Sequence, residues 1–68
     1  LSALKALRNR MAKEEKLPAY VIFSNATLED MAAKAPKTMQ QFLAVSGVGE
    51  VKARRYGKAF LEEIKRHS

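Results

Sequence analysis

The stretch that decides the fold is FLAVSGVGEVKARRYG, residues 42–57. An apolar run stops at the Gly-Val-Gly segment 47–49, and the chain restarts as a helix predicted over 50–66. A left-handed glycine commonly ends one helix, and here a second helix begins almost directly after it. Gly57 lies on the apolar side of that second helix, where the missing side chain permits a neighbouring helix to approach closely despite a propensity cost of about 1 kcal/mol. The pattern therefore predicts two helices joined by a tight hairpin.

The hairpin also offers a place for a phosphate. We expect Gly47 and Gly49 to adopt positive φ, which lets the backbone approach another molecule. The free amides and the dipole of the following helix favour an anion, and Lys52 and Arg55 stand in its first turns. In the alternative interpretation Gly47 caps the preceding helix, Gly49 is a turn residue, and no ligand binds.

A first amphipathic helix is predicted over about 1–17. Leu4, Leu7 and Met11 fall on one of its faces at helical spacing. Pro18 disfavours helix at the residue before it, so this helix should end at 16 or 17.

The segment between Pro18 and Pro36 completes the predicted elements. Residues 18–25 favour a strand locally, but nothing else in the chain offers a strand to pair with, so we expect an extended or single-turn connector packed on the core. A helix begins near Ser24, Asn25 and Thr27, which are all N-cap residues. Thr27 with Asp30 forms a weak capping box, and Pro36 ends the helix. A short helix, which Thr38 can cap, follows before the hairpin. The predicted fold class is all-α, a compact small helical bundle of four main helices plus a short helical connector, with a helix–hairpin–helix-like element.

Composition restricts the class of protein. At 68 residues and 47% hydrophobic content the chain fits one folded domain. Without cysteine it has no disulfide or thiolate metal site, and a reducing, intracellular setting fits. No apolar run approaches the ~18 residues of a membrane span, so we expect a soluble protein with no membrane partner. Because the chain begins at Leu1 and not at Met, we expect residues 1–68 to be a single domain cut from a longer polypeptide.

Thirteen Lys and Arg residues against seven Asp and Glu residues give a net charge of +6, which suits either a polyanionic partner or simple solubility. In the first helix the only acids are Glu14 and Glu15, against five cations that include Lys13 and Lys16. Tyr20 follows this basic helix, and an aromatic ring beside cations is what single-stranded nucleic acid stacks on. Spacing alone favours the alternative, a buried ring whose hydroxyl is satisfied locally.

No residue pattern supports catalysis or a metal site. The acidic pairs, such as Glu14-Glu15 and Glu62-Glu63, are sequence neighbours whose side chains diverge by ~100° on a helix, so we interpret them as solvated charges. His67 has no second histidine or cysteine to complete a metal site, and Ser46 has no nearby base. We therefore expect no enzyme activity, no metal and no cofactor in this domain.

Taken together, four segments in this order resemble the HRDC domain, the helicase-and-RNase-D C-terminal module. They are LPAYVIFSNATL at 17–28, APKT at 35–38, GVG at 47–49 and YG at 56–57. The match covers nearly the whole chain, and the Pro-x-Tyr-Val-Ile-Phe block looks most like the version in bacterial RecQ-type DNA helicases.

The resemblance implies a compact helical bundle tethered behind a helicase core, acting in DNA repair and recombination as an accessory unit that binds single-stranded or branched DNA. It implies a bacterial cytoplasmic location and a domain that is monomeric in isolation. In RecQ-like versions the aromatic of the Pro-x-Tyr-Val segment and basic residues of the first helix contribute to DNA binding, which here are Tyr20, Lys5 and Arg8. The full set of predicted nucleic-acid-binding residues is Lys5, Arg8, Lys13, Lys16, Tyr20, Gly47, Gly49, Lys52 and Arg55. Two alternatives stay open: a protein-interaction or self-association module, and an RNA-binding module of an RNase D-like enzyme.

Overall fold

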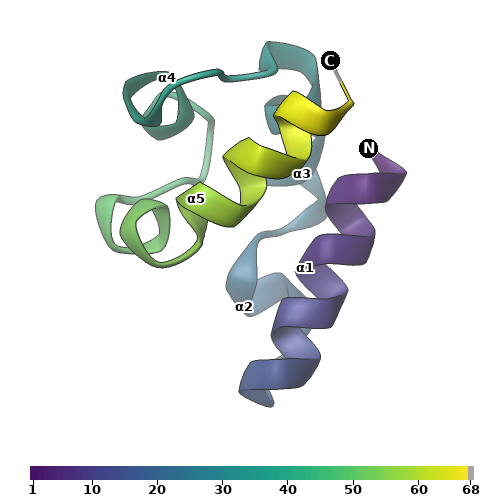
Figure 1. Ribbon diagram of the computed structural model, residues 1–68. Helices are drawn as coiled ribbons and strands as arrows, with labels where there is room; N and C mark the ends of the chain where they lie inside the picture. Colours follow the sequence, from purple (N-terminus) through teal and green to yellow (C-terminus); the bar gives the residue numbers. More distant parts are fainter. Residues whose placement is uncertain (68) are drawn as a thin grey trace.

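The computed structural model describes residues 1–67 and, within them, five helices and no strand (Figure 1). The helices are α1 (Ser2–Glu15), α2 (Ala19–Ile22), α3 (Asn25–Lys34), α4 (Met39–Leu43) and α5 (Glu50–Arg66). The all-α prediction is confirmed. In Figure 1, α1 runs along one side of the domain, α5 crosses its middle, and α2, α3 and α4 connect the two. In the described part of the chain no helix is both long and apolar enough to cross a membrane.

The connector after α1 forms a single helical turn, as predicted. α1 ends at Glu15 because Lys16 adopts the left-handed conformation, with φ 58°, and its amide bonds back to the last turn. Pro18 follows in an extended conformation and precedes α2, which is four residues long. The β-favouring residues of this segment find no strand to pair with, so the local helical turn prevails.

Two side-chain caps set the starts of α3 and α4. Ser24 caps α3 by accepting a hydrogen bond from the Thr27 amide at 3.2 Å. The predicted capping box of Thr27 and Asp30 is therefore wrong, because an N-cap residue stands three positions earlier and takes that role. Thr38 caps α4 by accepting from the Gln41 amide at 3.1 Å.

Aromatic rings fill the centre of the domain. Phe23, the residue that follows α2, is 1% exposed and meets Phe60 of α5 edge to face, with ring centroids 5.0 Å apart. It also lies 6.1 Å from the rings of Phe42 in α4 and Tyr56 in α5. Edge-to-face pairs contribute about 0.5–1.5 kcal/mol beyond the area they bury. Phe23 thus packs the segment that follows α2 against the middle of α5.

The hairpin between α4 and α5 has one left-handed glycine, not two. Gly47 has φ 85°, as predicted. Gly49 has φ −91° and ψ 167° because it is the N-cap of α5, a position that takes extended backbone. The expectation of positive φ at Gly49 is therefore wrong. At Gly57 a Cβ atom would lie 3.0 Å from Sδ of Met39, which confirms the predicted close approach of a neighbouring helix, α4.

Candidate nucleic-acid interface

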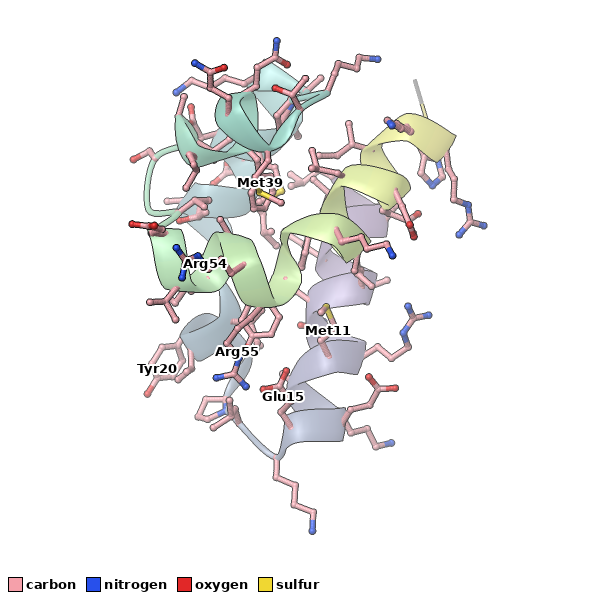
Figure 2. The ribbon with its side chains drawn as sticks, turned by 60° about the vertical axis from the view of Figure 1, so that its left-hand side comes forward. Met11, Glu15, Tyr20, Met39, Arg54 and Arg55 are labelled. Carbon is pink, nitrogen blue, oxygen red and sulfur yellow. The ribbon has the colours of Figure 1, made fainter. Side chains whose placement is uncertain are left out.

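An exposed aromatic ring stands on α2, beside the start of α5. Tyr20 is 72% exposed, so its ring is not part of the core. Figure 2 shows it on the same side of the domain as Arg54 and Arg55 of α5. Val51, in the first turn of α5, is 70% exposed, and it lies one helical turn before Arg55. We call the surface of Tyr20, Val51, Lys52 and Arg55 the α2–α5 face.

Lys52 connects this face to the core beneath it. Its Nζ lies 5.9 Å from the ring centroid of Phe23, a cation–π distance, while the residue itself is half-buried. Part of the side chain therefore packs on the core and part stays accessible, as is common for lysine. The cation is thus held over the ring of Phe23, which follows Tyr20 by three residues in the sequence.

Arg55 is held in place by two contacts. Its Nη2 donates to Oε1 of Glu15 at 3.0 Å, across the seam between α5 and α1. Its guanidinium carbon also lies 5.5 Å from the ring centroid of Tyr56. Arg55 remains largely exposed, with 61% of its side chain accessible.

Glu15 accepts a second hydrogen bond, from the Tyr56 hydroxyl at 3.1 Å. Tyr56 is 5% exposed, and burial, followed by this bond to Glu15, raises the pKa of its hydroxyl above the usual value. The interpretation of Glu15 as a solvated charge is therefore wrong. The contact joins residues about forty positions apart. The sequence signal that could have indicated it is that a tyrosine in the core requires a hydrogen-bond partner for its hydroxyl.

The basic residues of α1 do not form a single exposed surface. Lys13 and Lys16 are exposed, and no carboxylate in residues 1–67 pairs with either of them. Lys5 is half-buried, in the first half of the helix. Lys16, at the C-cap, is the basic residue of this segment that stands closest in sequence to α2.

Arg8 lies inside the domain. It is 8% exposed, and its Nη1 donates to the Phe23 carbonyl oxygen at 3.1 Å and to Oδ1 of Asn25 at 2.7 Å. Its Nε donates to Oδ1 of Asn9 at 3.2 Å. Arg8 lies at the border of the apolar face of α1, where its guanidinium group meets the Phe23 carbonyl group between α2 and α3. Its guanidinium therefore stabilises the α1–α2–α3 junction and offers little surface to a ligand.

The hairpin presents free amides but is also tied back to α3. Among residues 1–67, the amides of 50–52 have no acceptor, because the first helical bond of α5 is donated by Ala53. On the other side of the loop, Oδ2 of Asp30 accepts from the Ser46 amide at 2.8 Å and pairs with Lys34 at 2.9 Å. The Ser46 amide and Lys34 hold the pKa of Asp30 below its usual value. Gly47 and Gly49 are both exposed on this loop, so the predicted phosphate seat is open to solvent.

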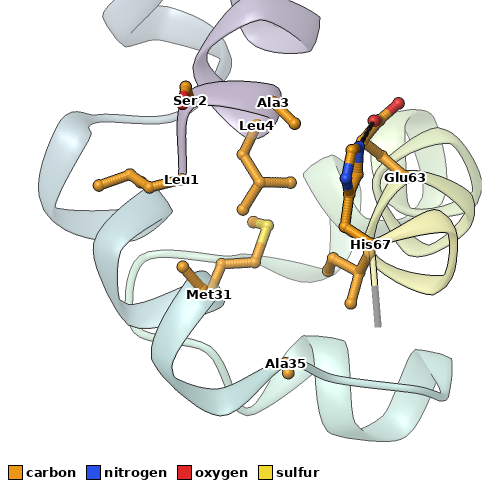
Figure 3. Close-up of a pocket in the computed structure, with 10 residues that line it drawn as sticks. Leu1, Ser2, Ala3, Leu4, Met31, Ala35, Glu63 and His67 are labelled. Carbon is orange, nitrogen blue, oxygen red and sulfur yellow. Dashed lines mark hydrogen bonds and ion pairs between the residues drawn. The ribbon is translucent and has the colours of Figure 1, made fainter.

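A pocket of about 370 Å³ lies at the opposite end of α1 from α2 (Figure 3). It is lined by the start of α1, by Met31 and Ala35 of the α3 region, and by the end of α5. On its rim Oε2 of Glu63 is hydrogen-bonded to Nε2 of His67 at 2.8 Å, and Oε1 of Glu63 pairs with Arg66 at 3.6 Å. Because only 16% of its side chain is exposed and both oxygens have partners, the interpretation of Glu63 as a solvated charge is also wrong. None of the predicted nucleic-acid-binding residues lines it, so the pocket and the α2–α5 face are separate features.

Comparison with known proteins identifies the fold. Residues 1–64 match the HRDC domain family. The chain is 41% identical over 64 residues to the ATP-dependent DNA helicase RecQ of Pasteurella multocida, covering 94% of this chain and 10% of that protein. It is 38% identical over 65 residues to RecQ of Bacillus subtilis, covering 96% of this chain and 11% of that protein. The chain thus spans about a tenth of the length of the curated relatives it matches. The solved structure of Deinococcus radiodurans RecQ HRDC domain 3 superposes with a TM-score of 0.92 and 40% identity, covering 96% of this chain and 86% of that one. The resemblance seen in the sequence is confirmed, and the chain belongs to the HRDC domain family.

Proposed function

We propose that this domain is an accessory nucleic-acid-binding module of a RecQ-type ATP-dependent DNA helicase. It binds single-stranded or branched DNA without sequence specificity, mainly through the backbone, and so modulates where the helicase acts in DNA repair and recombination. The RecQ relatives support the choice of parent protein. In this proposal the domain works as a monomer in the bacterial cytoplasm, and the unwinding chemistry belongs to the rest of the helicase.

The observation that carries the proposal is the exposed ring of Tyr20 beside cations that the core holds in place. An aromatic ring that is 72% exposed is available for a base to stack on, and each stacked base contributes about 1–3 kcal/mol. Arg55 lies on the same side of the domain as Tyr20 (Figure 2), and we expect phosphates of the stacked strand to reach Arg55 and Lys52, which is held over Phe23. Both cations are proposed to contact phosphates and not base edges, so we expect binding without sequence specificity.

Lys13 and Lys16 extend the proposed surface as phosphate contacts, and the half-buried Lys5 adds a separate contact nearer the start of α1. Gly47 and Gly49 form a second, smaller contact at the hairpin amides. Arg8 is left out of the proposed contact set because its guanidinium is used inside the domain. The domain is about 28 Å along its longest axis, so one strand of several nucleotides can reach from Tyr20 to the α1 lysines.

The test is fluorescence anisotropy of a labelled single strand of about 16 nucleotides, across salt from about 50 to about 200 mM. Tyr20→Ala should weaken binding by ~1–3 kcal/mol, about fivefold or more, without changing the slope of log affinity against log salt. Tyr20→Phe keeps the ring and serves as the matched control, with affinity near wild type. Lys16→Gln should instead reduce the salt slope by roughly 0.7. The proposal would be excluded if the wild-type domain did not bind the strand at low salt, or if its affinity did not change with salt concentration.

A protein-interaction module is the second candidate, and one observation favours it. Met39 and Leu43, one turn apart on α4, are 39% and 42% exposed although both are large and apolar. Light scattering that reports a dimer, lost in Leu43→Gln while DNA binding persists, would support self-association through α4. Competition between RNA and DNA strands of one sequence distinguishes the third alternative, an RNA-binding module.

A further inference from the structure

A carboxylate lies at the edge of the α2–α5 face, where a polyanion is proposed to bind. Oε1 of Glu15 accepts from Arg55 Nη2 at 3.0 Å and from the Tyr56 hydroxyl at 3.1 Å. Figure 2 shows Glu15 and Arg55 facing one another across the seam between α1 and α5. A negative charge at this place opposes the binding of phosphate, so its presence requires an explanation.

The bond from Tyr56 fixes the carboxylate. The Tyr56 ring is buried and meets Phe23 edge to face, at 6.1 Å and 75°, so the core sets the position of the hydroxyl. Only 29% of the Glu15 side chain is exposed. Because it is anchored to a buried hydroxyl, Glu15 cannot follow Arg55 toward a ligand. Arg55 therefore has to bind a phosphate with this carboxylate beside it.

Arg55 nevertheless keeps donors for a ligand. A guanidinium group has five N–H donors, and the bond to Glu15 uses one of them. The side chain is 61% exposed, and its guanidinium group lies over the Tyr56 ring, which limits its orientation. Glu15 thus has two opposite effects on Arg55: it orients the guanidinium group and it offsets the positive charge of that group.

We propose that Glu15 attenuates nucleic-acid binding at the α2–α5 face, holding Arg55 in position for a phosphate while its own charge lowers the affinity. The inference rests on the proposed function, since it concerns the same face. It predicts that removing the charge of Glu15 while keeping its acceptor oxygen strengthens binding. Glutamine does this, because its amide oxygen still accepts from the hydroxyl of Tyr56 and from Arg55.

Anisotropy with the labelled single strand at low salt tests the proposal, with Glu14→Gln as the matched control. Glu14 is the neighbouring residue, is exposed, and pairs with no cation in residues 1–67, so both substitutions change the net charge equally. Glu15→Gln should raise the affinity about two- to fivefold, and Glu14→Gln by clearly less. Glu15→Ala should gain less than Glu15→Gln, because Arg55 then also loses the acceptor that orients it.

A double-mutant cycle with Arg55→Gln isolates the pair. In that background the gain from Glu15→Gln should fall to the size of the gain from Glu14→Gln, and far-ultraviolet circular dichroism verifies that each variant is folded. Equal gains from the two glutamate variants, or a gain that persists undiminished without Arg55, would overturn the inference while the proposed function stands. A wild-type chain that binds no strand would overturn both.

Discussion

Gly47 is the position at which one added methyl group should disrupt the hairpin between α4 and α5. Its φ of 85° lies in the left-handed region, which side chains other than glycine rarely adopt. A Cβ atom there would overlap Oγ1 of Thr27, a residue of α3 that is 6% exposed. The substitution Gly47→Ala therefore combines backbone strain with a steric clash against a buried side chain.

The magnitude follows from four contributions. Left-handed backbone costs alanine about 1–2 kcal/mol. Displacing Thr27 breaks its 3.1 Å contact with Oγ of Ser24, a hydrogen bond worth about 1 kcal/mol, and overpacking adds about 1–3 kcal/mol. The stiffer unfolded chain returns about 0.4–1 kcal/mol. We expect Gly47→Ala to lower the free energy of unfolding by about 2–5 kcal/mol, a large part of the roughly 3–10 kcal/mol typical of a domain of this size.

Urea denaturation followed by circular dichroism measures this loss as a lower midpoint with an unchanged m value. Gly49→Ala is the matched control: Gly49 has φ −91° and no atom within 4 Å of the added Cβ, so its cost should stay below about 1 kcal/mol. In a Thr27→Ala background the clash disappears, and Gly47→Ala should cost only the strain of about 1–2 kcal/mol. Equal midpoints for the two glycine variants would refute the reasoning.

Two further predictions concern side chains that hold the helices together. Arg8→Ala leaves the Phe23 carbonyl oxygen without its donor and removes a buried side chain. Chemical denaturation should therefore report a decrease of about 2–3 kcal/mol in the free energy of unfolding. The control Arg10→Ala, at an exposed position, should cost less than about 0.5 kcal/mol. The pKa of Asp30 is lowered in the folded state, so on acidification the carboxylate is protonated in the unfolded chain before it is protonated in the folded one. The contribution of Asp30 to stability is therefore complete above a pH of about 4 and is lost as the pH falls below that value. Thermal melts on both sides of that pH should show a smaller acid-induced shift for Asp30→Asn, and an unchanged shift would contradict the assignment.

The parts of the fold that could be predicted are those set by neighbouring residues. The bounds of α5, Glu50–Arg66, follow from the apolar period and the glycines before it, and they are confirmed. Pro36 ends a helix and Thr38 begins one through contacts with residues a few positions away, and α3 and α4 are separated where these two residues predict. The start of α3 was harder, because Ser24 and Thr27 are both good caps three positions apart. The chain uses Ser24, whose hydroxyl accepts from the Thr27 amide.

The candidate site depends on contacts between residues far apart in the chain, and these contacts could not be predicted from the sequence. Tyr20 belongs to a helix of four residues, too short for a period to say which side faces water, and its exposure appears only in the packed structure. Arg8 fits a basic surface equally well by spacing, yet the carbonyl group it binds is 15 positions away. For both residues the deciding neighbours come from another helix, so only the tertiary arrangement separates a surface role from a structural one.

The net charge of +6 likewise does not show how many cations are available to a ligand. Cations contribute to nucleic-acid binding by the phosphates they neutralise, so what matters is how many are exposed without a carboxylate beside them. Arg55 is offset by Glu15 and Arg54 by Glu50, whereas Lys13 and Lys16 have no such partner in residues 1–67. The composition cannot separate these groups, because each pairing depends on where the acids lie in the fold. The salt slope of DNA binding should therefore reflect a few cations around α2 and the end of α1, and should fall far short of the slope expected if all thirteen basic residues took part.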